Sequence, residues 1–285
     1  MAHSAPLVNS FAPRCALPSP PAPGSLRFMK QPVTLIGVGE MGAVFSHALL
    51  RSGRPVFPIL RSTSLEDVAR VVPEPALVLV TVGEDDLHTS LDRMPDGWRS
   101  RAGLIQNELL PRDWDRYGIE SPTVAVVWFE KKPGRATKVL IPTPVAGPAA
   151  RMLVKALDSI DIPALQIPDE DLVDALVAKN LYILTANIVG LRTGGTVSEL
   201  WNEHRSLAGT VGSEILDIQE WLVGAPLDRE RAIDGMVRAI EGDPDHGTTG
   251  RSAPRRLERA IGHARSAGIE TPALIEIGRE AGLSV

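Results

Sequence analysis

The sequence predicts an α/β N-terminal domain with a mostly parallel sheet, followed by an all-α C-terminal domain. From Val33 to about residue 168, short apolar runs alternate with helical segments, which is typical of a parallel sheet covered by helices. From Asp169 onward, helical segments separated by Gly and Pro are predicted without further strands. A length of 285 residues suits two domains of ordinary size.

Residues 1–28 are predicted to be a disordered extension. They are rich in Pro, Ala and Ser and show no apolar periodicity that could bury a face. The alternative is a transit peptide, because the segment lacks Asp and Glu and carries Arg14 and Arg27. We favour Met29 as the natural start, which gives a sheet domain over residues 29–168 and a helical domain over residues 169–285.

Each element follows from its residue pattern. Short apolar runs bounded by turn residues are predicted as strands: Val33–Ile36, Pro55–Leu60, Ala76–Val82, Gly103–Ile105, Thr123–Phe129 and Lys138–Ile141. Longer segments with helix starts and stops are predicted as helices: Met41–Arg51, Leu65–Val71, Pro148–Ser159, Asp169–Arg192, Pro254–Ala267 and a last helix after Thr271-Pro272.

The composition excludes several classes of function. A net charge of −5 without a long Lys/Arg block argues against nucleic-acid partners and against binding to an anionic membrane surface. The longest apolar segment, 172–191, is interrupted by Lys179, Asn180 and Asn187, so it predicts a buried helix and not a membrane span. The single Cys15 excludes an internal disulfide, which favours a cytoplasmic location. The 6 histidines are dispersed, so no metal site is expected.

The segment from Gly37 to Gly42 reads Gly-Val-Gly-Glu-Met-Gly and matches G-x-G-x-x-G where a strand gives way to a helix. There Gly37 would make a tight turn, Gly39 would let the backbone approach a pyrophosphate, and Gly42 would let helix and strand pack closely. Glu40 and Met41 lie in the first helical turn, which would face the phosphates. The motif predicts a Rossmann domain that binds a dinucleotide; the alternative is a glycine turn without a ligand.

The residue after the second strand distinguishes the two nicotinamide cofactors. A carboxylate there would accept hydrogen bonds from the ribose of NAD, whereas this chain has Arg61 followed by Ser62, Thr63 and Ser64. A guanidinium beside hydroxyl groups suits a 2′-phosphate. The sequence therefore favours NADP(H), unless Arg61 is only a solvated surface residue.

Several segments resemble the ketopantoate reductase family, over roughly residues 29–282. They are the glycine motif with Arg61, the segment Gln106-Asn107-Glu108, the helix 177–187 and the stretch 259–272. The resemblance implies that Lys179 is the catalytic lysine, that Asn187 contacts the substrate, and that Asn107 lies beside the nicotinamide. It also implies a possible homodimer.

The chemistry of Lys179 supports this assignment independently. A Lys within an apolar helix is costly to bury unless it has a partner or a task, and desolvation would lower its pKa towards neutrality. Such a Lys can donate a proton to a carbonyl oxygen while hydride reaches the carbon. The alternative is that Lys179 extends to solvent and Asn187 caps a neighbouring loop; for Asn180 we expect a surface position.

The substrate half departs from the family pattern. Ser252 stands where the family has a carboxylate, and Ile183 stands where it has a further Asn. Ser252 could equally be a helix N-cap. Ahead of it, His246 could act as an acid or base and Arg251 could bind a carboxylate, although an ordinary polar loop would look the same. These departures indicate a related but different small-molecule substrate.

The sequence thus predicts an NADPH-dependent reductase of a 2-oxo acid or related carbonyl, with the proton supplied by Lys179. One alternative is an enzyme like the β-hydroxyacid dehydrogenases and imine reductases, whose glycine loop is similar and which also place a Lys on the interdomain helix. That group usually has an Asn four residues after the Lys, and this chain has Ile183 there, which argues against the alternative. The other is a relative that binds NADP without catalysis.

Overall fold

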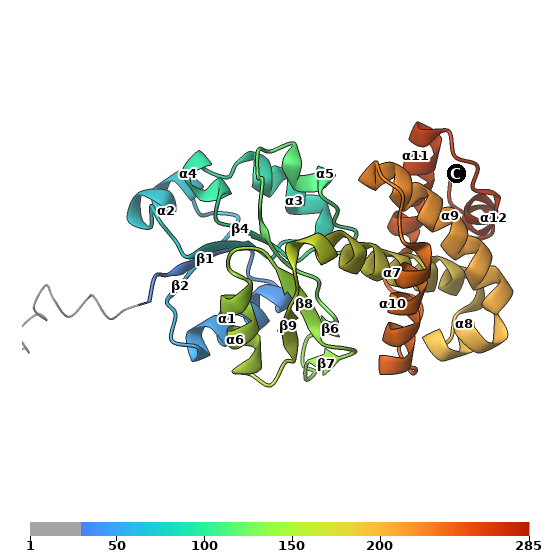
Figure 1. Cartoon of the computed structure of the whole chain (residues 1–285), viewed down its shortest axis with the longest axis horizontal. Coiled ribbons are helices and arrows are strands. Elements are labelled where there is room, and N and C mark those ends of the chain that lie inside the picture. The colour runs from blue at the N-terminus through green and yellow to red at the C-terminus, as the bar shows by residue number, and fades with distance from the viewer. Residues whose placement is uncertain (1–29, 285) are drawn as a thin grey trace, which may run out of the picture. The chain divides into compact units, whose positions relative to one another are not determined.

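The computed structural model describes residues 30–284, so the predicted extension 1–28 lies outside the described residues. A seven-stranded sheet organises the N-terminal part (Figure 1), in the order β2-β1-β3-β4-β5-β8-β9. Neighbouring strands are parallel except β5 and β8, which pair antiparallel. The strands are β1 (Val33–Ile36), β2 (Val56–Ile59), β3 (Leu77–Val80), β4 (Ala102–Leu104), β5 (Thr123–Ala125), β8 (Thr143–Ala146) and β9 (Ala164–Gln166). The predicted mostly parallel sheet is confirmed.

Helices cover both faces of this sheet, which explains why every residue of β1 and β3 is buried. One face packs against α1 (Glu40–Arg51) and α6 (Ala150–Asp158), through side chains such as Phe45 and Leu153. The other face carries α2 (Leu65–Val71), α3 (Glu84–Asp92), α4 (Asp96–Arg99) and α5 (Arg112–Asp115). The sequence pattern did not predict α3, α4 and α5, because these helices are short or polar.

The predicted strand 123–129 was wrong in its extent. It divides into β5 and a second short strand, β6 (Phe129–Glu130), which pairs with β7 (Lys138–Val139) in a separate two-stranded sheet. The chain leaves the main sheet between them, where the backbone N–H of Trp128 donates to Thr143 Oγ1 (3.1 Å). The apolar run 123–129 therefore belongs to two different sheets, which its residue pattern does not indicate.

Six helices form the C-terminal part (Figure 1) around α7 (Leu172–Thr193). The others are α8 (Val197–Glu203), α9 (Arg205–Val223), α10 (Arg229–Gly242), α11 (Ala253–Ala267) and α12 (Pro272–Glu280). The helix α7 packs against all five. It is long and apolar enough to span a membrane by composition, but 67% of its most apolar window is buried by protein, as in the core helix of a soluble protein.

The last strand of the sheet ends at Gln166, and the helical part begins with a 3₁₀ turn at Asp169–Asp171. The boundary predicted at residue 168 falls between them, and as a domain boundary it stays a prediction. The described residues from Gln31 onward group into one compact unit. The carboxyl ends of β3 and β4 lead into segments that contact α11, and the candidate site lies there.

Candidate active site

The glycine loop between β1 and α1 combines a tight turn with close packing of the helix. Gly37 has φ +93°, which favours glycine, and a Cβ there would lie 2.8 Å from Val82 Cγ1. A Cβ on Gly42 would collide with the carbonyl oxygen of Gly37, so close packing of α1 requires glycine there. A Cβ on Gly39 would meet nothing within 4 Å, which leaves open space at the N-terminus of α1.

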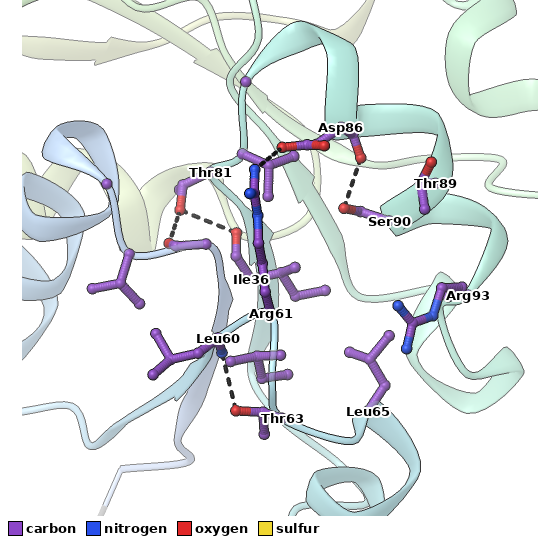
Figure 2. Close-up of a pocket in the computed structure, with 16 residues that line it drawn as sticks. Ile36, Leu60, Arg61, Thr63, Leu65, Thr81, Asp86, Thr89, Ser90 and Arg93 are labelled. Carbon is purple, nitrogen blue, oxygen red and sulfur yellow. Dashed lines mark hydrogen bonds and ion pairs between the residues drawn. The ribbon is translucent and has the colours of Figure 1, made fainter.

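A cavity of about 590 Å³ lies beside this loop (Figure 2). Its walls come from the carboxyl ends of β1, β2 and β3 and from one side of α3, which is where a Rossmann sheet binds its ligand. Gly37 and Gly39 line it, whereas Glu40 and Met41, which were also predicted to bind the cofactor, do not. The open space and the exposed N–H groups of the helix fit the phosphates of a dinucleotide.

Arg61 also lines the cavity, at the end of β2. Its guanidinium is almost fully exposed and donates a hydrogen bond to Asp86 Oδ2 (3.0 Å), as Figure 2 shows. Thr63 and Arg93 line the same cavity. The sequence did not reveal that α3 brings a carboxylate within reach of Arg61, because Asp86 lies 25 residues further along the chain.

Lys179 lies on α7 with its amine 4.2 Å from the centroid of the Trp128 ring. The pKa of Lys179 is lowered to about 7, chiefly by burial and then by the nearby positive charge of Arg256, while Glu84 acts in the opposite direction. The ring face of Trp128 also favours the charged amine. Lys179 is therefore able to gain and lose a proton near neutral pH.

The two predicted asparagines are both held by charged neighbours. Asn187 is buried; its Nδ2 donates to the carbonyl of Thr248 (2.9 Å), and its Oδ1 accepts from Arg256 (2.6 Å). Asn107 donates to Glu84 Oε1 (2.9 Å). The contact with Thr248 agrees with the alternative in which Asn187 caps a neighbouring loop. A substrate contact for Asn187 stays a prediction.

Arg256, which was not among the residues predicted from the sequence, joins these groups. It is buried and also donates to Glu84 Oε1 (3.2 Å) and Glu108 Oε1 (3.0 Å). Glu108, at φ +60°, accepts a further hydrogen bond from Arg259 (2.6 Å). The signal that could have revealed Arg256 is its place on the inward face of a helix among apolar residues, since buried arginine is rare without carboxylate partners.

In the loop before α11, His246 lies near α7, and its place in the site stays a prediction. His246 Nδ1 lies 3.3 Å from Asp243 Oδ2, and its ring centroid is 6.4 Å from that of Tyr182, one turn along α7 from Lys179. Among residues 30–284, no hydrogen bond or ion pair joins the side chain of Arg251 or Ser252 to a predicted site residue. Ser252 occupies the N-cap position of α11, but its hydroxyl makes no capping hydrogen bond.

Asn180 corrects a prediction. We expected it at the surface, but it is fully buried and donates to Leu109 O (3.3 Å) and Gln219 Oε1 (3.0 Å). The packing of α7 against α9 and the segment after β4 buries it instead.

Within residues 30–284, no group of three or more His, Cys, Asp or Glu side chains is arranged to hold a metal ion. The candidate site comprises Lys179, the amides of Asn107 and Asn187, and the hydrogen-bonded side chains of Glu84, Glu108 and Arg256.

No protein-family model and no curated protein sequence matches the chain. Solved structures do resemble it. A PanE/ApbA family ketopantoate reductase from Ralstonia eutropha JMP134 has a TM-score of 0.62 at 16% identity, over 88% of this chain and 97% of that chain. A dimeric ketopantoate reductase from Staphylococcus aureus has a TM-score of 0.60 at 15% identity, over the same shares of each chain.

A D-mandelate dehydrogenase, solved with NADH and anilino(oxo)acetate, has a TM-score of 0.62 at 14% identity, over 88% of this chain and 97% of that chain. These identities are low, so the likeness is one of fold. The sequence resemblance is confirmed at that level: this chain has the fold of the ketopantoate reductases.

Proposed function

We propose that this protein is an NADPH-dependent reductase of a 2-oxo acid or a closely related carbonyl compound. The single observation that supports it most is Lys179, a lysine with a pKa near 7 on the helix beside the nucleotide-binding sheet. The ketopantoate reductases and the D-mandelate dehydrogenase that share the fold point to the same class of reaction. A cytoplasmic location and a homodimer belong to the same proposal.

The cofactor, when bound, supplies the hydride. The glycine loop would hold its pyrophosphate, because Gly39 leaves open space in front of the N–H groups of α1. Arg61 would bind the 2′-phosphate by charge-assisted hydrogen bonds, for which it would exchange its present partner Asp86. Protonated Lys179 would give its proton to the carbonyl oxygen of the substrate. Asn107 and Asn187 would add neutral donors that stabilise the developing charge.

The first test is cofactor binding. NADPH and NADH are titrated against the full chain by fluorescence, and NADPH oxidation is then followed with a panel of 2-oxo acids and imines. We expect tighter binding of NADPH than of NADH and turnover of a 2-oxo acid. Turnover of imines alone would favour the imine reductase alternative. Binding without any turnover would favour a non-catalytic relative, and no binding would overturn the interpretation of Gly37 and Arg61.

The second test concerns the proton donor. The Lys179→Ala variant should bind NADPH with unchanged affinity and lose kcat by about three orders of magnitude. Lys155 is an exposed lysine on α6, so Lys155→Ala is the matched control and should retain full activity. Unchanged turnover in Lys179→Ala would remove Lys179 from the mechanism.

A further inference from the structure

Burial of the charged guanidinium of Arg256 is unfavourable unless hydrogen-bond acceptors surround it. It is 7% exposed, and an unpaired guanidinium in such a place would be strongly destabilising. Its three acceptors come from three different elements: Glu84 from α3, Glu108 from the segment after β4, and Asn187 from α7. The same side chain therefore ties the edge of the sheet to the helical part at the candidate site.

These hydrogen bonds fix the orientation of both amides. Because Asn187 Oδ1 accepts from Arg256 and its Nδ2 donates to Thr248, the amide of Asn187 can face only one way. On the other side, Glu84 Oε1 accepts from both Arg256 and Asn107. A continuous chain of hydrogen bonds thus runs from Asn107 to Asn187, with Arg256 at its centre.

Arg256 also sets the charge around Lys179. The charged groups that act on Lys179 are Arg256 from α11 and Glu84 from α3. One turn further along α7, Asp243 from the loop after α10 and Glu130 from β6 act on Tyr182 instead. Arg256 is thus the positive charge that lowers the pKa of Lys179. Without Arg256, Glu84 would be the remaining charged group that acts on Lys179.

We propose that Arg256 is a positioning residue of this active site, which orients Asn107 and Asn187 through direct and Glu84-mediated hydrogen bonds and places a fixed positive charge beside Lys179. This inference rests on the proposed function. It adds a residue for which the sequence resemblance gave no role.

The kinetic test compares three variants. Arg256→Gln should lose kcat by about 10- to 100-fold, because the amides lose their orientation, with little change in the affinity for NADPH. Arg256→Lys keeps the charge and should show a smaller loss. Arg259→Gln is the matched control, since Arg259 binds the same Glu108 but makes no contact with Asn187. Equal losses in Arg256→Gln and Arg259→Gln would overturn the proposal.

The second measurement needs no turnover. The chain contains six lysines, at 30, 131, 132, 138, 155 and 179, so ¹³C-labelled lysine gives a spectrum that Lys179→Ala can assign. Titrated without cofactor, Lys179 should have a pKa near 7 in the wild type. In Arg256→Gln it should rise by about one unit. In Arg256→Lys and in Arg259→Gln it should stay close to the wild-type value.

The outcomes separate the two proposals. A wild type without reductase activity, but with the expected shift in Arg256→Gln, would refute the proposed function and leave the charge role of Arg256 standing. An active wild type whose Lys179 titrates identically in Arg256→Gln and Arg259→Gln would refute the role of Arg256 alone. Should Arg256→Gln fail to fold, Arg256→Lys tests the inference: it predicts a loss of kcat without a shift in the pKa of Lys179.

Discussion

At the scale of single residues, burial of the charged amine of Lys179 lowers the free energy of unfolding. Its pKa is about 7 in the folded protein and near 10.5 when exposed. The cost of burying the charge is therefore fully present below pH 7 and is relieved as the pH rises towards 10.5. We expect Lys179→Met to be more stable than the wild type at pH 6, with a gain that shrinks at pH 9. Urea unfolding at the two pH values measures this, and a gain independent of pH would contradict it.

Arg61 gives a second prediction at this scale. In the unliganded protein Asp86 holds its guanidinium, so a 2′-phosphate must compete with that carboxylate. Asp86→Asn should tighten NADPH binding several-fold and leave NADH binding unchanged, because it removes both a competitor and a negative charge. Arg61→Ala should weaken NADPH binding alone. Fluorescence titration checks both variants, and an equal effect on the two cofactors would assign Arg61 to the surface.

At the scale of elements, two glycines of the loop have separate roles: Gly42 in packing and Gly39 in binding. A Cβ on Gly42 would collide with Gly37, so Gly42→Ala should lower the melting temperature whether or not NADPH is present. A Cβ on Gly39 meets only open space, so Gly39→Ala should melt like the wild type and bind NADPH at least tenfold more weakly. Thermal unfolding with and without NADPH distinguishes them. Normal binding by Gly39→Ala would place the pyrophosphate elsewhere.

A second feature at this scale is the close packing of α7 against the loop before α11. A Cβ on Gly190 would lie 2.6 Å from Thr248 Cβ, and Asn187 donates to the carbonyl of Thr248. Gly190→Ala should therefore displace the loop that carries His246 and raise KM for the substrate more than that for NADPH. Steady-state kinetics with each substrate varied in turn measures the difference, and an unchanged KM for the substrate would separate the loop from the site.

At the scale of the whole molecule, ion pairs connect the sheet to the helical part. Glu108 binds Arg256 and Arg259, and Asp85 pairs with Arg255. Glu108→Ala leaves the buried Arg256 with one carboxylate fewer and should destabilise the protein by several kcal/mol. Glu108→Gly removes the same pair but suits φ +60°, so it should be less destabilising by roughly 1 kcal/mol. Chemical unfolding compares the two, and equal values would show that the backbone at Glu108 is unstrained.

The sequence by itself determined the parts of this protein that depend on local pattern. The glycine loop, the parallel sheet and the long helix α7 each follow from residues that are close together in the chain, and so does a lysine on an apolar helix. Periodicity and glycine spacing express such local requirements directly. The short polar helices α3 and α5 and the division of the run 123–129 were missed because their boundaries depend on pairing with distant segments.

The tertiary structure alone decided which charges meet at the site. Glu84 and Arg256 are 172 residues apart, as Glu108 and Arg259 are 151 apart, and no local pattern joins them. It also decided that Asn180 is buried and that Arg61 faces Asp86. The physical reason is that electrostatic partners are selected by distance in space and by desolvation, and both depend on how the sheet and the helices pack.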